Sequence, residues 1–468
     1  DENDSTDHKT HLVIGWMLGE SSDLKQLLEA QLLSSVLLDN SASPLQHALE
    51  TTELGRAPSP LCGLEDSMRE LVFSCGIEGS EAEHADALED MVLAVLERVA
   101  LEGVSQQRLE AVLHQLELHQ REVTGDGYPF GLQLILQALG CATHYSDPIA
   151  VLNLEPVIVE LQQKIQDPDY IRQLARRLLL DNPHRVTLVM TPDTELSAHR
   201  LAQETARLAD IKAAMSDAQR SATVQLAADL SARQAQVDDD SILPKVELSD
   251  VPATLPEPTF TKTELHGMPF TTYGQGTNGI VYQQGTAPLP ALSEEQLQIL
   301  PLYTNILTDV GLGDQSYMDV QERQAATVGS IAGFVSMRGH ADDEQRVSAN
   351  FTLSSKALLR NARDQAQLMS DTLHRVKFSE TSRIRDLVNQ QRARRDQSIT
   401  GSGHSLAMAA ASAGMSPLAS MHHHQSGLAG IRQLRILDDS LADDTRLEAF
   451  ALEVKKLHET LISTPMQF

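Results

Sequence analysis

Apolar residues fall in a pattern that predicts strands and helices mixed along the first part of the chain. The run His11–Leu18 is apolar almost throughout, which is typical of a buried strand, and Arg69–Ile77 and Arg185–Met190 predict two more strands. A leucine-rich helix is expected from about Asp23 to Leu38, and Leu88–Val99 repeats apolar residues at helical spacing. Strands interleaved with consecutive helices favour an α+β fold with a sheet covered on one face.

Two residues mark helix ends in this first part. Gly103 is placed to cap the helix that contains Val99, and Ser105 is expected to begin another helix that reaches about Val123.

A second unit with the same kind of pattern begins near Phe260. We expect three strands there, then long helices, and a final short strand at Met466–Phe468; the strands are Gly279–Tyr282, Ser330–Met337 and Val347–Leu353, and the helices are Ser355–Lys377 and Asp443–Ser463. The shared order of elements in the two units hints at an internal duplication.

The segment between the units, Leu196–Val237, is rich in Ala, Gln and Asp and predicts two helices folded as a hairpin, because Ser216–Gln219 is a capping-box pattern that restarts a helix. The acidic run Asp238–Asp240 and four prolines follow, which favours an extended connector; the prolines are Pro244, Pro252, Pro256 and Pro258. We therefore expect an α+β domain at 1–193, a hairpin and Pro-rich linker at 194–259, and a second, homologous α+β domain at 260–468. Each domain is expected to be a mainly antiparallel sheet with helices on one face.

Charge adds a constraint on partners. The chain has 65 Asp and Glu against 37 Lys and Arg, a formal net charge of −28. Phosphate groups repel so acidic a surface, so nucleic acid is a poor partner, whereas a basic or unfolded peptide is a better one. No apolar run approaches the roughly 18 residues of a membrane-spanning helix. Acidity that only keeps the protein in solution is the alternative interpretation.

Three cysteines, Cys62, Cys75 and Cys141, form no CxxC pair, so we expect buried free thiols in a reducing compartment. The acidic segment Asp1–Thr10 has no signal-peptide features, and the chain does not begin with methionine. We expect a processed or excised piece, with any targeting segment upstream.

Histidines give two candidate metal sites, and neither has the required spacing. His114 and His119 flank Glu117 but are five residues apart, about 140° around a helix, so both cannot reach one tetrahedral zinc ion. We expect an amphipathic helix with solvent-facing histidines. The run His422–His424 has no Cys or carboxylate within five residues and predicts adventitious metal affinity. His458-Glu459 does not continue as H-E-x-x-H.

Three further patterns resemble functional motifs without their context. Gly274–Gly279 matches GxGxxG, but strand-like residues follow it, so a glycine-rich turn is expected instead of a nucleotide site. Ser402–Ser405 (SGHS) lacks the GxSxG nucleophile pattern and predicts a glycine-broken helix junction. The only basic cluster predicts an exposed helix face or pairing with acidic residues; it contains Arg383, Arg385, Arg392, Arg394 and Arg395. No catalytic constellation is visible.

Six segments in order nonetheless resemble the presequence protease branch of the pitrilysin-type zinc metallopeptidases, the inverzincins. They are Asn40–Leu45, Ser59–Ser67, Leu109–Glu117, Gly125–Leu132, Thr277–Tyr282 and Ser402–Ser405. The resemblance implies four homologous α+β domains in two halves, closing around a chamber that admits unfolded peptides. This chain is similar to the second domain, the hairpin and the third domain.

The same resemblance implies that the zinc motif lies in the first domain and the substrate-holding Arg and Tyr in the fourth, both outside this sequence. No catalytic or metal-binding residue is therefore assigned here, and substrate-binding residues stay unassigned. We expect no activity and no zinc in this chain alone, basic unfolded peptides as ligands, and the missing domains as partners. A non-catalytic scaffold or peptide-binding subunit is the alternative. A bacterial cytoplasm is the expected location, or an organelle matrix in a eukaryote.

Overall fold

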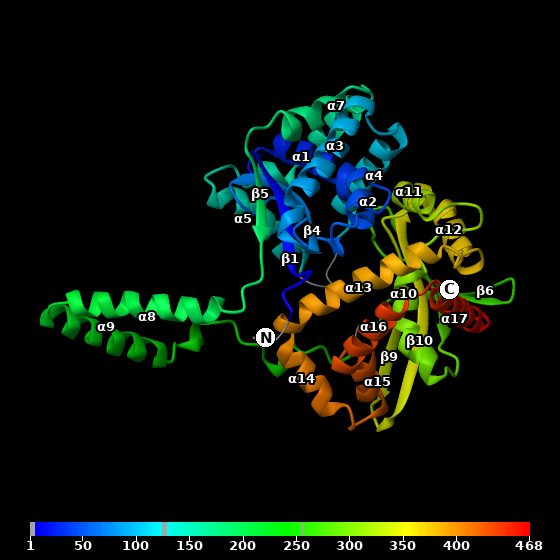
Figure 1. Cartoon of the computed structure of the whole chain (residues 1–468). Coiled ribbons are helices and arrows are strands. Elements are labelled where there is room, and N and C mark those ends of the chain that lie inside the picture. The colour runs from blue at the N-terminus through cyan, green and yellow to red at the C-terminus, as the bar shows by residue number, and fades with distance from the viewer. Residues whose placement is uncertain (1–4, 124–128, 255–256) are drawn as a thin grey trace. The chain divides into compact units, whose positions relative to one another are not determined.

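A computed structural model describes residues 5–123, 129–254 and 257–468 (Figure 1). The chain divides into two compact units, which are described separately. One consists of Pro192–Thr259 with the described residues before Asp7, and the other of Asp7–Thr191 with Phe260–Phe468. The larger unit contains a five-stranded and a three-stranded antiparallel sheet, each with its own apolar core, and a separate two-stranded sheet.

The first sheet has the order β2-β4-β1-β5, with β3 also paired to β4. Its strands are β1 (Thr10–Glu20), β2 (Ala57–Pro58), β3 (Gly63–Glu65), β4 (Glu70–Ser80) and β5 (Arg185–Met190). Ile14 lies opposite Cys75 on one side and Thr187 on the other, both in antiparallel register. The three strands expected from the apolar pattern are thus β1, β4 and β5, joined in one sheet.

Helices cover the face of this sheet that Leu12, Ile14 and Trp16 present to the core. They are α1 (Leu24–Leu38), α2 (Pro44–Thr51), α3 (Ala85–Glu102), α4 (Gln106–Arg121), α6 (Glu155–Lys164) and α7 (Tyr170–Ala175). Helix α5 (Phe130–Thr143) lies between α4 and α6 in the chain. Trp16 Nε1 donates to the carbonyl of Leu179 at 3.0 Å, in a π-helical turn at Arg176–Leu180. The polar tip of a fully buried indole is thereby satisfied.

Local capping sets several of these boundaries as expected. The Asp23 carboxylate accepts from the backbone of Lys25 and Gln26 to begin α1, and Ser105 accepts from Arg108 to begin α4. Gly103 ends α3 with φ of 75°, a conformation that residues with a Cβ rarely adopt.

The second sheet has the order β8-β10-β9, from strands β8 (Ile280–Pro288), β9 (Ser330–His340) and β10 (Asp343–Leu358). A separate hairpin, β6 (Phe260–Leu265) with β7 (Met268–Tyr273), was not expected from the sequence. The end of the chain joins β7 and β8 by backbone hydrogen bonds. The backbone of Phe468 donates to Pro269 and accepts from Thr271, and Gln467 forms a β-bridge with Thr286.

The core of this part contains Tyr303, Phe351 and Phe450, all fully buried. The helices that contribute to it are α10 (Glu294–Ile306), α12 (Ala362–His374), α13 (Thr381–Gly401), α16 (Leu428–Ser440) and α17 (Asp444–Ile462). The other helices of this part are α11 (Tyr317–Thr327), α14 (Gly403–Ser412) and α15 (Pro417–Gln425).

The helix predicted for Ser355–Lys377 begins later in the structure than the sequence pattern indicated. Strand β10 continues to Leu358, and Ser355 pairs with Gln283 on one side and Ile331 on the other. Ser355 and Ala357 are buried while Lys356 between them is not, which is the two-residue period of a strand. Two neighbouring strands outweigh the helical spacing, so α12 starts only at Ala362.

The smaller unit contains the two helices expected between the α+β parts, α8 (Leu196–Ala214) and α9 (Asp217–Ala235), which run antiparallel in Figure 1. Ser216 and Gln219 form the expected capping box. Neither helix has a buried residue. Arg207 and Glu204 form an ion pair on the surface of α8.

Candidate functional site

Helix α4 carries the first histidine candidate and lies along the second α+β part. Gln115 Nε2 donates to the carbonyls of Ala325 and Val328 at 2.6 and 2.7 Å, and Arg108 pairs with Glu322 at 2.6 Å. At the end of the helix, Glu122 pairs with Lys356 at 2.6 Å. These contacts join the α+β part that contains the first sheet to the α+β part that contains the second sheet. We call this set of contacts the junction.

The junction corrects the expectation that both histidines of α4 face solvent. His114 is buried, with no hydrogen-bond partner for Nε2 among the described residues, whereas His119 is exposed. Burial lowers the pKa of His114, and Arg360 lowers it further. Glu117 pairs with Arg360 at 2.8 Å, and that hydrogen bond lowers the pKa of its carboxyl. The carboxylate between the histidines thus belongs to an ion pair.

The other histidine run lies on α15. His424 is exposed and its Nδ1 lies 2.8 Å from the carbonyl of Ser420, while its ring meets that of His423 edge-on at 5.5 Å. Across the described residues, no group of three or more His, Cys, Asp or Glu side chains is arranged to hold a metal ion.

The GxGxxG match and the SGHS segment lie in the kinds of local structure that the sequence predicted. Gly274–Gly279 is the turn from β7 into β8, and Ser402 lies between α13 and α14, so neither forms a nucleotide loop or a nucleophile elbow.

The three cysteines are free. Cys75 and Cys141 are buried, but Cys62 is only half-buried, which corrects the expectation of full burial. Burial raises the pKa of Cys62 to about 11, which leaves it a weak nucleophile. Residues 125–128 of the segment Gly125–Leu132 lie outside the described residues.

The arginine cluster lies on α13, where three of its members pair with acids. Arg385 pairs with Asp444, and Arg392 with Asp438 and Asp439. Arg383 is not on an exposed face as one interpretation had it: its side chain is 4% exposed and pairs with Glu50 at 3.2 Å. The position of α13 across the junction explains this burial.

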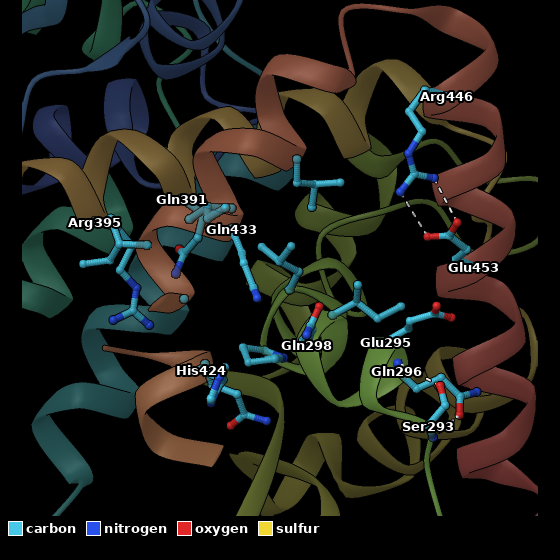
Figure 2. A pocket seen from close by; sticks show the side chains of 18 of the residues that line it. Ser293, Glu295, Gln296, Gln298, Gln391, Arg395, His424, Gln433, Arg446 and Glu453 are labelled. Atoms are coloured by element: carbon cyan, nitrogen blue, oxygen red, sulfur yellow. Dashed lines mark hydrogen bonds and ion pairs between the residues drawn. The ribbon is translucent and has the colours of Figure 1, made fainter. Parts of the chain in front are cut away.

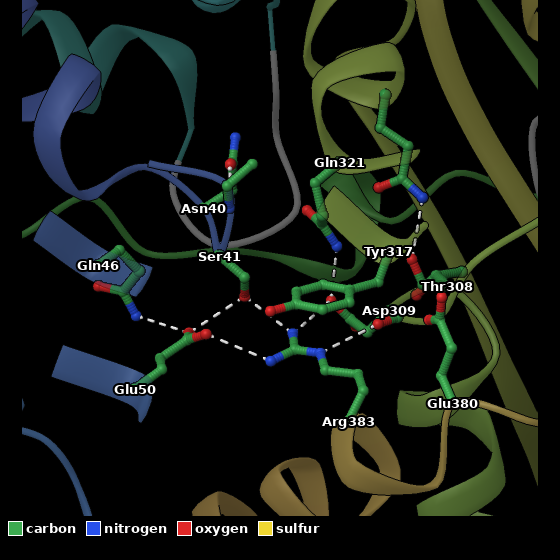
Figure 3. Close-up of polar contacts among 12 residues, drawn as sticks. Asn40, Ser41, Gln46, Glu50, Thr308, Asp309, Tyr317, Gln321, Glu380 and Arg383 are labelled. Carbon is green, nitrogen blue, oxygen red and sulfur yellow. Dashed lines mark hydrogen bonds and ion pairs between the residues drawn. The ribbon is translucent and has the colours of Figure 1, made fainter. Parts of the chain in front are cut away.

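Arg383 joins both α+β parts at once (Figure 3). Its guanidinium donates to Ser41 Oγ at 2.8 Å and to the carbonyl of Asp309 at 3.2 Å, and it lies 4.6 Å from the centre of the Tyr317 ring. Glu50 in turn accepts from Ser41 and Gln46. A second carboxylate, that of Asp309, lies 3.9 Å from the guanidinium. The buried cation is thus compensated by two carboxylates, a hydroxyl and a carbonyl oxygen, and an aromatic face.

Segments that carry the family resemblance meet at this junction. Ser41 comes from Asn40–Leu45, and Glu117 from Leu109–Glu117. Asn278, from Thr277–Tyr282, donates to the carbonyl of Arg121 at 3.0 Å. These segments therefore hold the two α+β parts together.

A cavity of about 560 Å³ opens among the helices of the second α+β part, away from the residues of the junction named above (Figure 2). Helices α10, α13, α15, α16 and α17 all contribute to it. Its apolar wall is formed by Ile299, Pro301, Leu302, Ile431, Leu434 and Leu437. No pattern in the sequence indicated it, since the lining residues come from five separate helices between Ser293 and Lys456.

Pro301 shapes this wall. It lies inside α10 and has no N–H to donate, so the carbonyl of Leu297 lacks its usual partner four residues on. Gln425 at the end of α15 donates its side-chain amide to that carbonyl at 2.9 Å. The contact ties α15 to α10, and a proline inside a predicted helix is the one sequence signal that could have indicated it.

Polar side chains surround the cavity. Gln298, Gln391 and Gln433 have no side-chain hydrogen bond within the described residues, and Figure 2 shows them among the lining residues together with Arg395 and His424. Arg446 pairs with Glu453 at 2.9 Å. Arg395 and Lys456 form no ion pair in the described part of the chain, and Glu295 is the one acid in the lining besides Glu453.

Comparison with known proteins gives matches along nearly the whole chain. The profile of the family described as the peptidase M16 inactive domain matches residues 2–116. The profile of the associated domain of peptidase family M16, subfamily C, matches residues 190–437, more than half of the chain. Within the described residues, no helix has the length and apolar character needed to cross a bilayer.

Curated relatives include presequence protease 1, chloroplastic/mitochondrial, of Arabidopsis thaliana, 26% identical over 97% of this chain and 42% of its own length. The mitochondrial presequence protease of Xenopus tropicalis is 25% identical over 98% of this chain and 45% of its own length. The chain spans less than half the length of these relatives. Among solved structures, pitrilysin is 10% identical over 82% of this chain and 38% of its own, with a TM-score of 0.37.

These relatives are mitochondrial or chloroplastic, so the expectation of a bacterial cytoplasm finds no support among them. The match of the subfamily C profile to more than half of the sequence agrees with the resemblance carried by the six segments. The chain therefore belongs to subfamily C of the M16 peptidases, the presequence protease branch of the pitrilysin-type zinc metallopeptidases.

Proposed function

We propose that this chain is the central, non-metal-binding part of a zinc metalloendopeptidase that degrades unfolded peptides such as presequences inside a closed chamber. One observation carries the proposal: relatives named presequence proteases match the chain over 97% of its length, while it spans only 42% of theirs.

In this proposal the chain consists of two homologous domains, 1–193 and 260–468, joined by the hairpin and linker at 194–259. The junction keeps the domains in one fixed arrangement, and first and fourth domains outside this sequence complete the chamber. Because the named relatives are mitochondrial or chloroplastic, we place the protein in an organelle matrix.

The charge of −28 gives the chamber wall its selectivity in this proposal. Presequence-like peptides are basic, so an acidic wall raises their local concentration and disfavours acidic peptides. Each exposed pair contributes only about 0–1 kcal/mol and is screened within about 8 Å at physiological salt. Binding to this chain alone should therefore be weak and strongly salt-dependent.

Titration of a labelled, unstructured basic peptide into the 468-residue chain at low and high salt tests this selectivity. A charge-reversed peptide of the same length is the matched control. We expect the basic peptide to bind more tightly at low salt and the difference to vanish at high salt. Equal binding of both peptides, unchanged by salt, would contradict the proposed role of the acidic charge.

A further inference from the structure

We propose that the cavity among α10, α13, α15, α16 and α17 binds the C-terminal end of a peptide through its free carboxylate. The inference deepens the proposed function and rests on it only in taking the ligand to be a peptide. Three features of the lining support it: its local charge, its unpaired amides and its apolar wall.

The local charge of the cavity is opposite to that of the chain. Arg446 and Glu453 neutralise each other, which leaves Arg395 and Lys456 against Glu295. A net positive site in a chain of charge −28 favours an anionic group at this place specifically. A guanidinium presents paired donors that match the two oxygens of a carboxylate.

The unpaired amides indicate a peptide as the bearer of that carboxylate. Gln298, Gln391 and Gln433 come from three different helices, and each side chain offers both a donor and an acceptor. A peptide backbone presents the same two groups at every residue. By contrast, Gln296 and Gln425 already pair with Ser293 and with the Leu297 carbonyl, so their amides serve the helix ends.

The apolar wall completes the fit. Ile299, Leu302, Ile431 and Leu434 offer a surface for one or more apolar side chains of the ligand. The volume of about 560 Å³ lies within the roughly 300–1,000 Å³ of typical ligand sites. A short peptide end can therefore place its carboxylate toward Arg395 while its basic residues remain outside, near the acidic surface.

Calorimetric titration of the 468-residue chain with acetyl-Ala-Leu-Leu tests the proposal, with the carboxamide of the same peptide as control. Neither peptide has a basic side chain, so the result does not depend on the acidic wall. We expect the free acid to bind about tenfold more tightly, as a charge-assisted hydrogen bond predicts. Equal affinity of acid and amide would overturn the proposal.

Variants locate the binding site. Arg395→Gln should weaken binding of the acid about tenfold and leave binding of the amide unchanged, which also shows that the fold is intact. Arg432→Gln is the matched control, because Arg432 is an exposed residue of α16 outside the cavity lining. An equal loss of affinity for the acid in Arg432→Gln would overturn the proposal. Displacement of the bound peptide by inorganic phosphate, at a concentration as low as that at which the free-acid peptide binds, would overturn it too.

Discussion

The guanidinium of Arg383 lies 3.2 Å from the carboxylate of Glu50, a residue 333 positions away in the chain. Both side chains are more than nine-tenths buried, so the pair is an internal contact of the junction. Removal of one partner from a buried ion pair leaves the other charge uncompensated, which costs far more than the pair contributes when intact.

We expect Arg383→Met to lower the free energy of unfolding by about 3–5 kcal/mol, since Glu50 then lies buried without its cation. Urea unfolding followed by fluorescence of the single tryptophan, Trp16, measures this change. Glu50→Gln provides the second variant. The double variant should lose clearly less than the sum of the two single losses; strict additivity would contradict a direct coupling.

His458 predicts a dependence of stability on pH. A carbonyl can only accept, so His458 Nε2 donates to Leu373 at 3.0 Å, and Nδ1 accepts from the Tyr303 hydroxyl at 2.9 Å. Burial lowers the pKa of His458 from 6.5 to about 4. Between these values the unfolded chain binds more protons, so the contribution of His458 is complete above pH 6.5 and is lost as the pH falls toward 4.

The loss amounts to up to about 3 kcal/mol at pH 4. We therefore expect the unfolding free energy of the His458→Phe variant to change less between about pH 7 and pH 4.5 than that of the unchanged chain. The exposed His404 supplies the control, and His404→Phe should keep the original pH profile. Identical profiles for all three proteins would rule out His458 as the titrating group.

The hydrogen bond from Gln425 to the Leu297 carbonyl predicts that removal of the Gln425 amide destabilises the fold, and that the size of this effect depends on Pro301. Gln425→Leu leaves the Leu297 carbonyl without a partner and should lower the unfolding free energy by about 1 kcal/mol. In a Pro301→Ala background, the new N–H at position 301 satisfies that carbonyl, so the same change should cost much less. An equal cost in both backgrounds, measured by urea unfolding, would contradict this account of the proline.

The linker should be the first site of proteolysis. Every described residue from Asp238 to Pro258 is exposed, whereas α3 contributes Leu88, Val92 and Val99 to the first core. After a cut in the linker, the two fragments should still elute together from a gel-filtration column, because the junction holds them. Early cleavage within α3, or separation of the fragments without denaturant, would contradict this organisation.

Local signals in the sequence predicted much of the fold. Asp23, Ser105 and Ser216 each form a cap with a residue two or three positions on, so the short pattern is enough to place the helix start. The end of β10 depends instead on pairing of Ser355 with two distant strands, and the sequence pattern indicated a helix there.

The candidate site was less accessible to sequence reasoning. Arg383 resembled an exposed arginine because its partners Ser41, Glu50 and Asp309 are distant in the chain. The burial of His114 was not indicated by the pattern of its own helix. Gln298, Gln391 and Gln433 form no motif, since convergence of separate helices alone brings them around one cavity.

In the proposed function, the metal centre and the hydrolytic activity lie outside this chain but within the same polypeptide. Elemental analysis and cleavage of a presequence peptide, measured on the untagged 468-residue chain and on the complete polypeptide that contains it, test this most directly. We predict one zinc per molecule and cleavage for the complete polypeptide, and neither for the chain alone. One tightly held zinc in the chain alone, lost on mutation of His114 or His119, would contradict the account, as would a complete polypeptide without zinc.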